Sequence, residues 1–174
     1  MKRVAKFEKI SYKQFEKDWM DTYGIRALDT NERRRIESIY NEIKLPKRAT
    51  SGSAGYDFFA PETFILEPGK IIKIPTGIRC SMDENWVLKI YPRSGLGFKY
   101  RETLANTVGI IDSDYFYSDN EGHIFIKVVN AGNKTFDVMA GTGFAQGIFV
   151  EYGITDDDNV TDIRNGGIGS TDQK

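Results

Sequence analysis

The sequence contains only one cysteine and one histidine among its 174 residues. A single cysteine, Cys80, excludes a disulfide within the chain and a metal site built from several thiolates. Cys80 falls in the apolar run Ile78 to Met82, which favours a buried core thiol over a nucleophile. The lone histidine, His123, excludes a histidine-rich transition-metal site, and its polar, turn-like surroundings predict a surface position.

A long apolar segment and a strong charge of either sign are also missing. No window approaches the roughly 20 apolar residues of a membrane span, and the basic N-terminus is not followed by the apolar stretch of a secretory signal. We therefore expect a cytoplasmic protein with no membrane partner. The formal net charge of -1 argues against nucleic acid as the main partner, because proteins that bind phosphate backbones usually carry a basic excess. A small anionic ligand held by a few local cations is still compatible with this charge.

The first part of the chain predicts one short strand followed by helices. Residues 4–10 alternate roughly between apolar and polar types, as a strand does. Between Tyr12 and Ile43 the chain is rich in charges, and its apolar residues recur at helical spacing. Asp29 and Thr30 are placed to cap a second helix there. We interpret residues 12–43 as a helical insertion, and its three consecutive arginines at 33–35 are typical of a solvated helix face.

After Leu45-Pro46, short runs rich in β-branched and aromatic residues alternate with turn residues. The expected strands lie at residues 56–60, 71–74, 87–90, 123–129 and 147–152, and this spacing predicts an all-β barrel or sandwich. The chain length fits a single domain. Residues 156–174 are polar and glycine-rich without a helix or strand period, which predicts a flexible C-terminal arm.

Five short segments have polar chemistry that simple turns do not need. The first, residues 53–57, places the carboxylate of Asp57 before an apolar strand. The second, residues 91–97, sets an arginine and a serine between a proline and two glycines, a combination that suits phosphate binding. The third, residues 104–115, has two strand-like halves that meet near Gly109, which predicts a hairpin. It also puts Asp112 at the end of a buried strand, where a general base fits, although an isolated aspartate there more often satisfies a turn.

The fourth segment, residues 141–148, places Gln146 in an apolar strand, where its amide needs partners because an unpaired buried amide costs about 1–3 kcal/mol. The fifth, residues 164–171, combines glycines, hydroxyls and one arginine, and could wrap phosphates with backbone N–H groups. Taken together and in this order, the five segments resemble the five motifs of the dUTPase family. The match is closest in the Pro-Arg-Ser-Gly loop and in residues 106–115.

This resemblance implies a fold and an activity. The fold would be a single all-β domain over residues 1–174, a jelly-roll-like β-barrel with the helical insertion near its N-terminus and the flexible arm at its C-terminus. The protein would be a homotrimer whose active sites are each built from three chains. It would be a dUTP diphosphatase that converts dUTP to dUMP and pyrophosphate, which limits uracil in DNA and supplies dUMP for dTMP synthesis.

The resemblance also implies roles for individual residues. Asp112 would be the general base that activates a water for attack on the α-phosphorus, and Tyr115 would pack under the deoxyribose and exclude a 2′-hydroxyl. Uracil would be read around Asn106, Gly109, Ile110 and Ile111. The remaining nucleotide contacts would come from Arg93, Ser94, Gly95, Phe125, Gln146, Arg164, Ile168, Gly169, Ser170 and Thr171. The implied cofactor, Mg²⁺, would bind the triphosphate and reach Asp57 only through water.

Some positions depart from the family pattern. Ile168 stands where a phenylalanine usually stacks on uracil, Phe144 replaces a usual arginine, and Asp172 replaces a usual glycine. Residues 116–121 look like an inserted loop, and the helical insertion has no family role. Two alternatives therefore stay open: a dCTP deaminase, which shares the fold and the trimer, and a regulatory nucleotide-binding protein that contacts a protein partner through the helical insertion.

Overall fold

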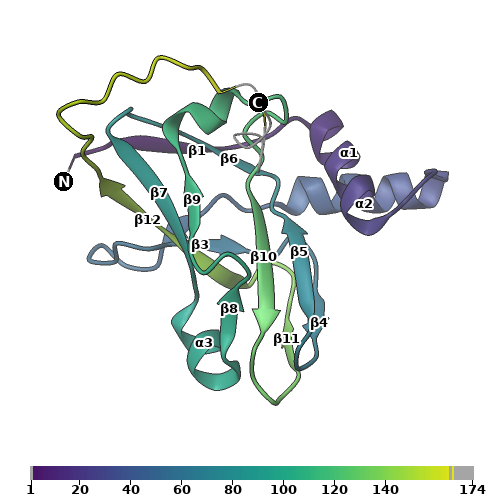
Figure 1. Cartoon of the computed structure of the whole chain (residues 1–174). Helices are drawn as coiled ribbons and strands as arrows, with labels where there is room; N and C mark the ends of the chain where they lie inside the picture. The colour runs from purple at the N-terminus through teal and green to yellow at the C-terminus, as the bar shows by residue number, and fades with distance from the viewer. Residues whose placement is uncertain (1, 165, 167–174) are drawn as a thin grey trace.

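The computed structural model describes residues 2–164 and 166, which form a β-barrel with two helices packed at its side (Figure 1). The helices are α1 (Tyr12–Tyr23), α2 (Thr30–Glu42), α3 (Ser94–Tyr100) and the 3-10 helix η1 (Ser113–Tyr117). The strands are β1 (Ala5–Lys9), β2 (Lys47–Arg48), β3 (Tyr56–Phe59), β4 (Phe64–Leu66), β5 (Ile71–Pro75), β6 (Ile78–Met82), β7 (Trp86–Pro92), β8 (Glu102–Leu104), β9 (Gly109–Ile111), β10 (Phe125–Asn130), β11 (Phe136–Val138) and β12 (Gly143–Glu151).

The strands form four antiparallel sheets that wrap one apolar core. The largest has the order β2-β3-β12-β7-β9, a second has the order β5-β10-β8, and β1-β6 and β4-β11 form two-stranded ribbons. Neighbours in these sheets are mostly distant in sequence, as in jelly-roll folds. Side chains alternate between core and surface, for example in β10, where Ile126 and Val128 are buried and Lys127 is exposed. The predicted all-β, jelly-roll-like fold is confirmed.

The register of β12 brings three of the five motifs to one place. Gln146 lies opposite Asp57 on β3 and opposite Tyr91 on β7. The next residue, Gly147, has no room for a side chain, because a Cβ there would lie 2.8 Å from Leu88 Cδ1. Glycine therefore lets the core side chains pack directly against the β12 backbone, and this close packing fixes the strand beneath the site.

The two helices predicted within residues 12–43 are present and pack onto the barrel. Asp29 caps α2 as predicted, with its carboxylate accepting a hydrogen bond from the Glu32 amide at 2.8 Å. Phe15 and Trp19 of α1 are 0% exposed, so this helix contributes to the main core. Its amphipathic face replaces solvent over the end of β5, where Figure 1 shows α1 and α2 at the side of the barrel.

The prediction that His123 is a surface residue is wrong: its side chain is 0% exposed. The local sequence is polar, but α1, more than 100 residues away in the chain, covers this segment and supplies Asp18 at 2.6 Å. Burial of Cys80 is confirmed; the thiol is 2% exposed, and desolvation raises its pKa to about 12, which leaves it unreactive at neutral pH.

The hairpin predicted for residues 104–115 is also wrong. The two strand-like halves exist as β8 and β9, but β8 pairs with β10 and β9 pairs with β7. The chain turns a corner between two sheets at Asn106 and Thr107, and Thr107 has a φ of 65°. For residues 104–115, the alternation of side chains identifies two strands but does not specify the partner of either strand. The sequence therefore could not distinguish a β8–β9 hairpin from pairing of each strand with a distant one.

The segment at residues 91–97 is likewise not an open loop, because β7 ends at Pro92 and α3 begins at Ser94.

The C-terminal segment has no helix or strand in its described residues, 156–164 and 166, as the composition predicted. It returns from β12 across the barrel toward η1 (Figure 1). Ile168, Gly169, Ser170 and Thr171 lie outside the described residues. Within the described part of the chain, no helix has the length and hydrophobicity needed to cross a membrane.

Glu102 of β8 gives the fold a testable pH dependence. The residue is 2% exposed, and a backbone hydrogen bond from Arg93 only partly offsets the effect of burial on its carboxyl group. Burial raises the pKa of Glu102 to about 8, so the folded state keeps its proton where the unfolded chain has lost it. Glu102 therefore makes its full contribution to the free energy of unfolding below the unfolded pKa of 4.5, and this contribution is lost as the pH rises toward 8. Urea unfolding at pH 5 and pH 8.5 should show a larger loss of stability for the wild type than for Glu102→Gln. Equal losses would contradict the assignment.

Candidate functional site

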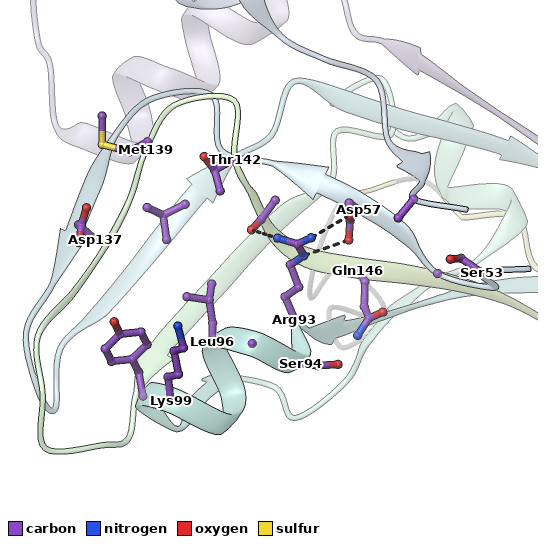
Figure 2. A pocket seen from close by; sticks show the side chains of 16 residues that line it. Ser53, Asp57, Arg93, Ser94, Leu96, Lys99, Asp137, Met139, Thr142 and Gln146 are labelled. Carbon is purple, nitrogen blue, oxygen red and sulfur yellow. Dashed lines mark hydrogen bonds and ion pairs between the residues drawn. The ribbon is translucent and has the colours of Figure 1, made fainter. Parts of the chain in front are cut away.

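A polar pocket of about 640 Å³ lies where β3, β7 and β12 meet α3 (Figure 2). Its walls include most of the residues singled out in the first, second and fourth motifs. These are Gly55, Asp57, Arg93, Ser94, Gly95 and Gln146. The β12 register and the strand-to-helix transition after Pro92 therefore gather residues that lie up to 91 positions apart in the sequence.

Arg93 and Asp57 form the ion pair at the centre of this pocket, which we call the phosphate pocket. Arg93 Nε lies 3.3 Å from Asp57 Oδ1, and Nη2 donates to Oδ2 at 3.3 Å. A third guanidinium nitrogen, Nη1, donates to the Gly143 carbonyl at 3.4 Å. Figure 2 shows the guanidinium facing Asp57, with Ser94 and Gln146 nearby. Long, shared contacts of this kind hold the guanidinium in place, and an anionic ligand could compete for it.

Gln146 finds the partner that its burial requires. Its amide nitrogen donates to the Pro92 carbonyl at 3.0 Å, which ties β12 to the end of β7. Its amide oxygen points toward Gly55, where a Cβ would lie only 2.7 Å away. Gly55 is thus needed for close approach and not for an unusual backbone angle. Ser94 and Gly95 form the first turn of α3, and first-turn N–H groups have no partners within the helix.

A second, more apolar pocket of about 470 Å³ lies between the β8–β9 corner and β10. We call it the nucleoside pocket; its walls include Asn106, Gly109, Ile110, Ile111 and Phe125. Tyr115, which the resemblance also assigned to the nucleoside, is not among its lining residues. Gly109 again permits close packing, because a Cβ there would lie 3.0 Å from Ile90 Cβ. Lys73 places its ammonium 4.2 Å from the centre of the Phe125 ring. A flat, largely apolar heterocycle with a few polar edges suits these walls.

Asp112 lies directly after the nucleoside pocket and is paired with the C-terminal segment. Arg164 Nη2 lies 2.6 Å from Asp112 Oδ2, and Arg164 Nε lies 2.9 Å from Asp114 Oδ1. The Asp112 side chain is 48% exposed, so water also reaches it. One oxygen of the predicted general base is therefore paired with an arginine for which the family resemblance implied a contact to the nucleotide.

Tyr115 is held more tightly than the sequence suggested. It is 3% exposed, and burial raises its pKa. Its hydroxyl donates to the His123 carbonyl at 2.7 Å and accepts from Asn120 Nδ2 at 2.9 Å. The Arg164 guanidinium carbon lies 5.8 Å from the centre of the ring. A sugar could pack on this ring only after Arg164 moves.

The sequence prediction missed Asp18, Asn120 and His123, which support Tyr115. Asp18 could have been noticed, because it lies three residues after Phe15 and next to Trp19, on the apolar face of α1. A charged residue at such a position needs a buried partner. Asn120 carried no comparable signal, because it lies in a polar loop.

The residues that could hold a metal ion are few. Within residues 2–164 and 166, no three His, Cys, Asp or Glu side chains cluster as ligands. The phosphate pocket offers Asp57 as the carboxylate predicted for this role, and Arg93 already pairs with it. This donor set fits Mg²⁺ that is carried mainly by phosphate oxygens and waters, and it does not fit an all-protein cage.

The chain is similar to dUTPases in sequence and in structure. The family model described as dUTPase matches residues 41–172. The deoxyuridine 5′-triphosphate nucleotidohydrolase from Lactococcus lactis is 41% identical to this chain, and the match covers 74% of this chain and 88% of the relative. The enzyme of the same name from Haemophilus influenzae is also 41% identical, and the match covers 75% of this chain and 89% of the relative. The crystal structure of the Streptococcus mutans dUTPase superposes with a TM-score of 0.61 at 31% identity, covering 86% of this chain and 98% of that one. The matched region contains both pockets, and the chain belongs to the dUTPase family.

Proposed function

We propose that this protein hydrolyses dUTP to dUMP and pyrophosphate, with Asp112 as the general base. The observation that carries the proposal is the arrangement of the motifs: one pocket offers an arginine and helix-start amides for phosphates, the other offers an apolar slot for a base, and Asp112 adjoins the second. This division matches a substrate that has a flat base at one end and a charged chain at the other.

The chemistry requires an activated water near the α-phosphorus. Asp112 is accessible to water, and its carboxylate can accept a proton from a water that attacks phosphorus. Arg93 can stabilise the charge that develops on the phosphate oxygens, because its planar guanidinium can exchange Asp57 for phosphate. Positioning and charge stabilisation account for most of the rate increase in such reactions.

The nucleoside pocket supports selection of a deoxyuridine. The Asn106 amide can pair with an edge of the base, while Ile110 and Ile111 supply apolar walls. The backbone at Gly109 packs closely on Ile90 and so forms a fixed wall of this pocket. We expect this wall to disfavour the additional methyl group of thymine. If Arg164 moves away from the Tyr115 ring, the ring can lie against the sugar of the nucleotide. It would then occupy the space that a 2′-hydroxyl needs.

Arg164 gives the site a way to respond to substrate. Its guanidinium pairs with Asp112 and Asp114 and lies over the Tyr115 ring. A triphosphate provides stronger acceptors for the same guanidinium. Transfer of Arg164 to the phosphates would free the general base and the sugar platform together, so that both become available only when substrate is bound.

Mg²⁺ would enter the phosphate pocket bound to the phosphates of the substrate. Asp57 would hold it through water, and Arg93 and Gln146 would orient the same phosphate chain. When bound, the ion supplies charge neutralisation on the departing pyrophosphate.

The assembly that best explains the two pockets is a homotrimer in which different chains contribute to one site. The phosphate pocket and the nucleoside pocket share no lining residue. The surface also carries exposed apolar side chains that an interface would cover, among them Phe98 at 93%, Ile71 at 53% and Ile110 at 51%. Closed cyclic symmetry would join one chain's phosphate pocket to the nucleoside pocket of another.

The first prediction concerns the reaction itself. Pyrophosphate release should be rapid from dUTP and slow from UTP, dCTP and dTTP, and Asp112→Asn should lower kcat by about 100-fold or more, because a general base contributes 10²–10⁴-fold. Asp83→Asn, an exposed carboxylate paired with Lys2, is the matched control. Ammonia release from dCTP would indicate the deaminase, and binding of dUTP without turnover would favour the regulatory protein.

The second prediction tests whether sites are shared. Arg93→Ala and Asp112→Asn should each be nearly inactive alone. Refolding the two together should restore about a quarter of wild-type activity, because random mixing in a closed ring pairs an intact Arg93 with an intact Asp112 in that share of sites. A mixture as inactive as its parents would show that both residues serve a site from the same chain.

The third prediction concerns the metal. Removal of Mg²⁺ with a chelator should abolish turnover, and added Mg²⁺ should restore it. Asp57→Asn should raise the Mg²⁺ concentration for half-maximal rate by about tenfold, since a neutral amide binds the hydrated cation less well. Asp137→Asn, which changes an exposed carboxylate of the same pocket, should leave this concentration unchanged.

A further inference from the structure

The helical insertion and the loop at residues 116–121 contact each other, although neither belongs to the family pattern. Ser11, which caps α1, donates to the Glu121 carboxylate from its backbone amide at 2.7 Å and from its hydroxyl at 2.6 Å. These bonds join the start of the insertion to the end of the loop. The loop begins immediately after Tyr115, so the insertion reaches the residue proposed to select the sugar.

Asp18 and His123 form a second, buried link, between α1 and a residue that lies two positions after the loop. His123 Nδ1 lies 2.6 Å from Asp18 Oδ2, and the side chains are 0% and 10% exposed. His123 Nε2 accepts a hydrogen bond from the Gly77 amide at 2.8 Å. Because Nε2 is the acceptor, the proton of the neutral ring must lie on Nδ1 and be donated to Asp18. Every polar atom of this imidazole is therefore used, and its orientation is fixed.

The backbone of the same histidine is a hydrogen-bond partner of Tyr115. The Tyr115 hydroxyl donates to the His123 backbone carbonyl at 2.7 Å, and Asn120 holds the same hydroxyl from the loop. The His123 ring also packs on Phe125 of the nucleoside pocket, with the ring centres 4.3 Å apart. One histidine thus contacts both a wall of the nucleoside pocket and the anchor of the sugar platform.

We propose that Asp18 of the helical insertion is a positioning residue for the active site, acting through His123 on Tyr115. Asp18 orients the imidazole, the imidazole fixes the residue whose carbonyl anchors Tyr115, and Tyr115 discriminates against the 2′-hydroxyl. The inference rests on the proposed function for the role of Tyr115. It gives the helical insertion a task in substrate selection, which the family pattern does not assign to it.

The position of Asp18 supports this task over simple surface solvation. The helix that carries it is fixed in the core by Phe15 and Trp19, so the carboxylate has little freedom. Its other oxygen accepts from Gln14 Nε2 at 2.9 Å, which restricts it further. Besides Asp18, the charged groups that act on His123 are Lys73 of β5 and Glu121 of the loop, but neither hydrogen-bonds to the ring.

The test compares Asp18→Ala with three reference proteins. Asp18→Asn keeps an oxygen that can accept the Nδ1 proton, Asp21→Ala changes an exposed carboxylate of the same helix, and Ile36→Val weakens the core at α2, away from Tyr115. Ile36→Val reports what a loss of stability alone does to activity. Thermal unfolding of all variants identifies those that are equally destabilised.

The expected result is a change in selectivity and not only in stability. Asp18→Ala should lower the ratio of kcat/KM for dUTP to that for UTP by about tenfold, because a buried N–H left without its acceptor forces the ring to move. Asp18→Asn should retain most of the ratio, and Asp21→Ala and Ile36→Val should retain all of it. An unchanged ratio in Asp18→Ala, with dUTP still turned over, would overturn the proposal.

A second measurement does not depend on turnover. His123 is the only histidine in the chain, so its imidazole signals in NMR spectra need no separation from others. Asp18→Ala should shift these signals and those of the Tyr115 ring, and the ring should flip faster; Ile36→Val should change neither. Unshifted Tyr115 signals would overturn the proposal even if the wild type does not hydrolyse dUTP, a result that would by itself refute only the proposed function.

Discussion

The close packing of β12 between β3 and β7 is the constraint on which the site depends. At Gly147 the core side chains approach the β12 backbone so nearly that any Cβ would collide with them. The strand is therefore fixed in depth and in register, and a shift by one residue would turn every side chain to the opposite face. Gln146 then lies opposite Asp57, and its amide reaches the carbonyl of Pro92 at the point where β7 gives way to α3. Arg93 lies at this transition, and its guanidinium pairs with Asp57. The phosphate pocket is thus a consequence of barrel packing, with its charged pair set by backbone register.

The sequence predicted features that depend on local pattern and missed those that depend on distant contacts. Alternation and turn residues located most strands, and an aspartate at Asp29 located the start of α2, because both effects act within a few residues. The ordered motifs singled out several residues that the structure brings together in the two pockets, although Tyr115 and Arg164 are not among the lining residues. The errors arose where a partner far along the chain decides the outcome. His123 was taken for a surface residue because its neighbours are polar, yet α1 covers it. The β8–β9 corner was taken for a hairpin because two strands in sequence do not reveal that each pairs elsewhere.

The electrostatics of the site follow one rule: each arginine proposed to bind phosphate is paired with a carboxylate. Arg93 pairs with Asp57, and Arg164 pairs with Asp112 and Asp114. Neutralising these arginines within the protein avoids leaving partly buried charges without partners, which would be costly. It also means that the phosphates of a nucleotide must replace the carboxylates as partners of these arginines. The phosphates must therefore be better hydrogen-bond acceptors than the carboxylates. A chain of several phosphate groups meets this condition more readily than a single anion does.

The departures from the family pattern become related once they are placed in the structure. The helical insertion and the loop after Tyr115 are far apart in sequence, but Ser11 bonds to Glu121, and Asp18 bonds to His123. A longer loop beside an active site gains freedom that works against a fixed Tyr115. A helix that supplies a cap-to-loop bond and a buried acceptor removes that freedom, because each bond restricts one end of the loop. The helical segment therefore offsets the freedom of the loop, because Ser11 holds the end of the loop and Asp18 holds the residue that anchors Tyr115.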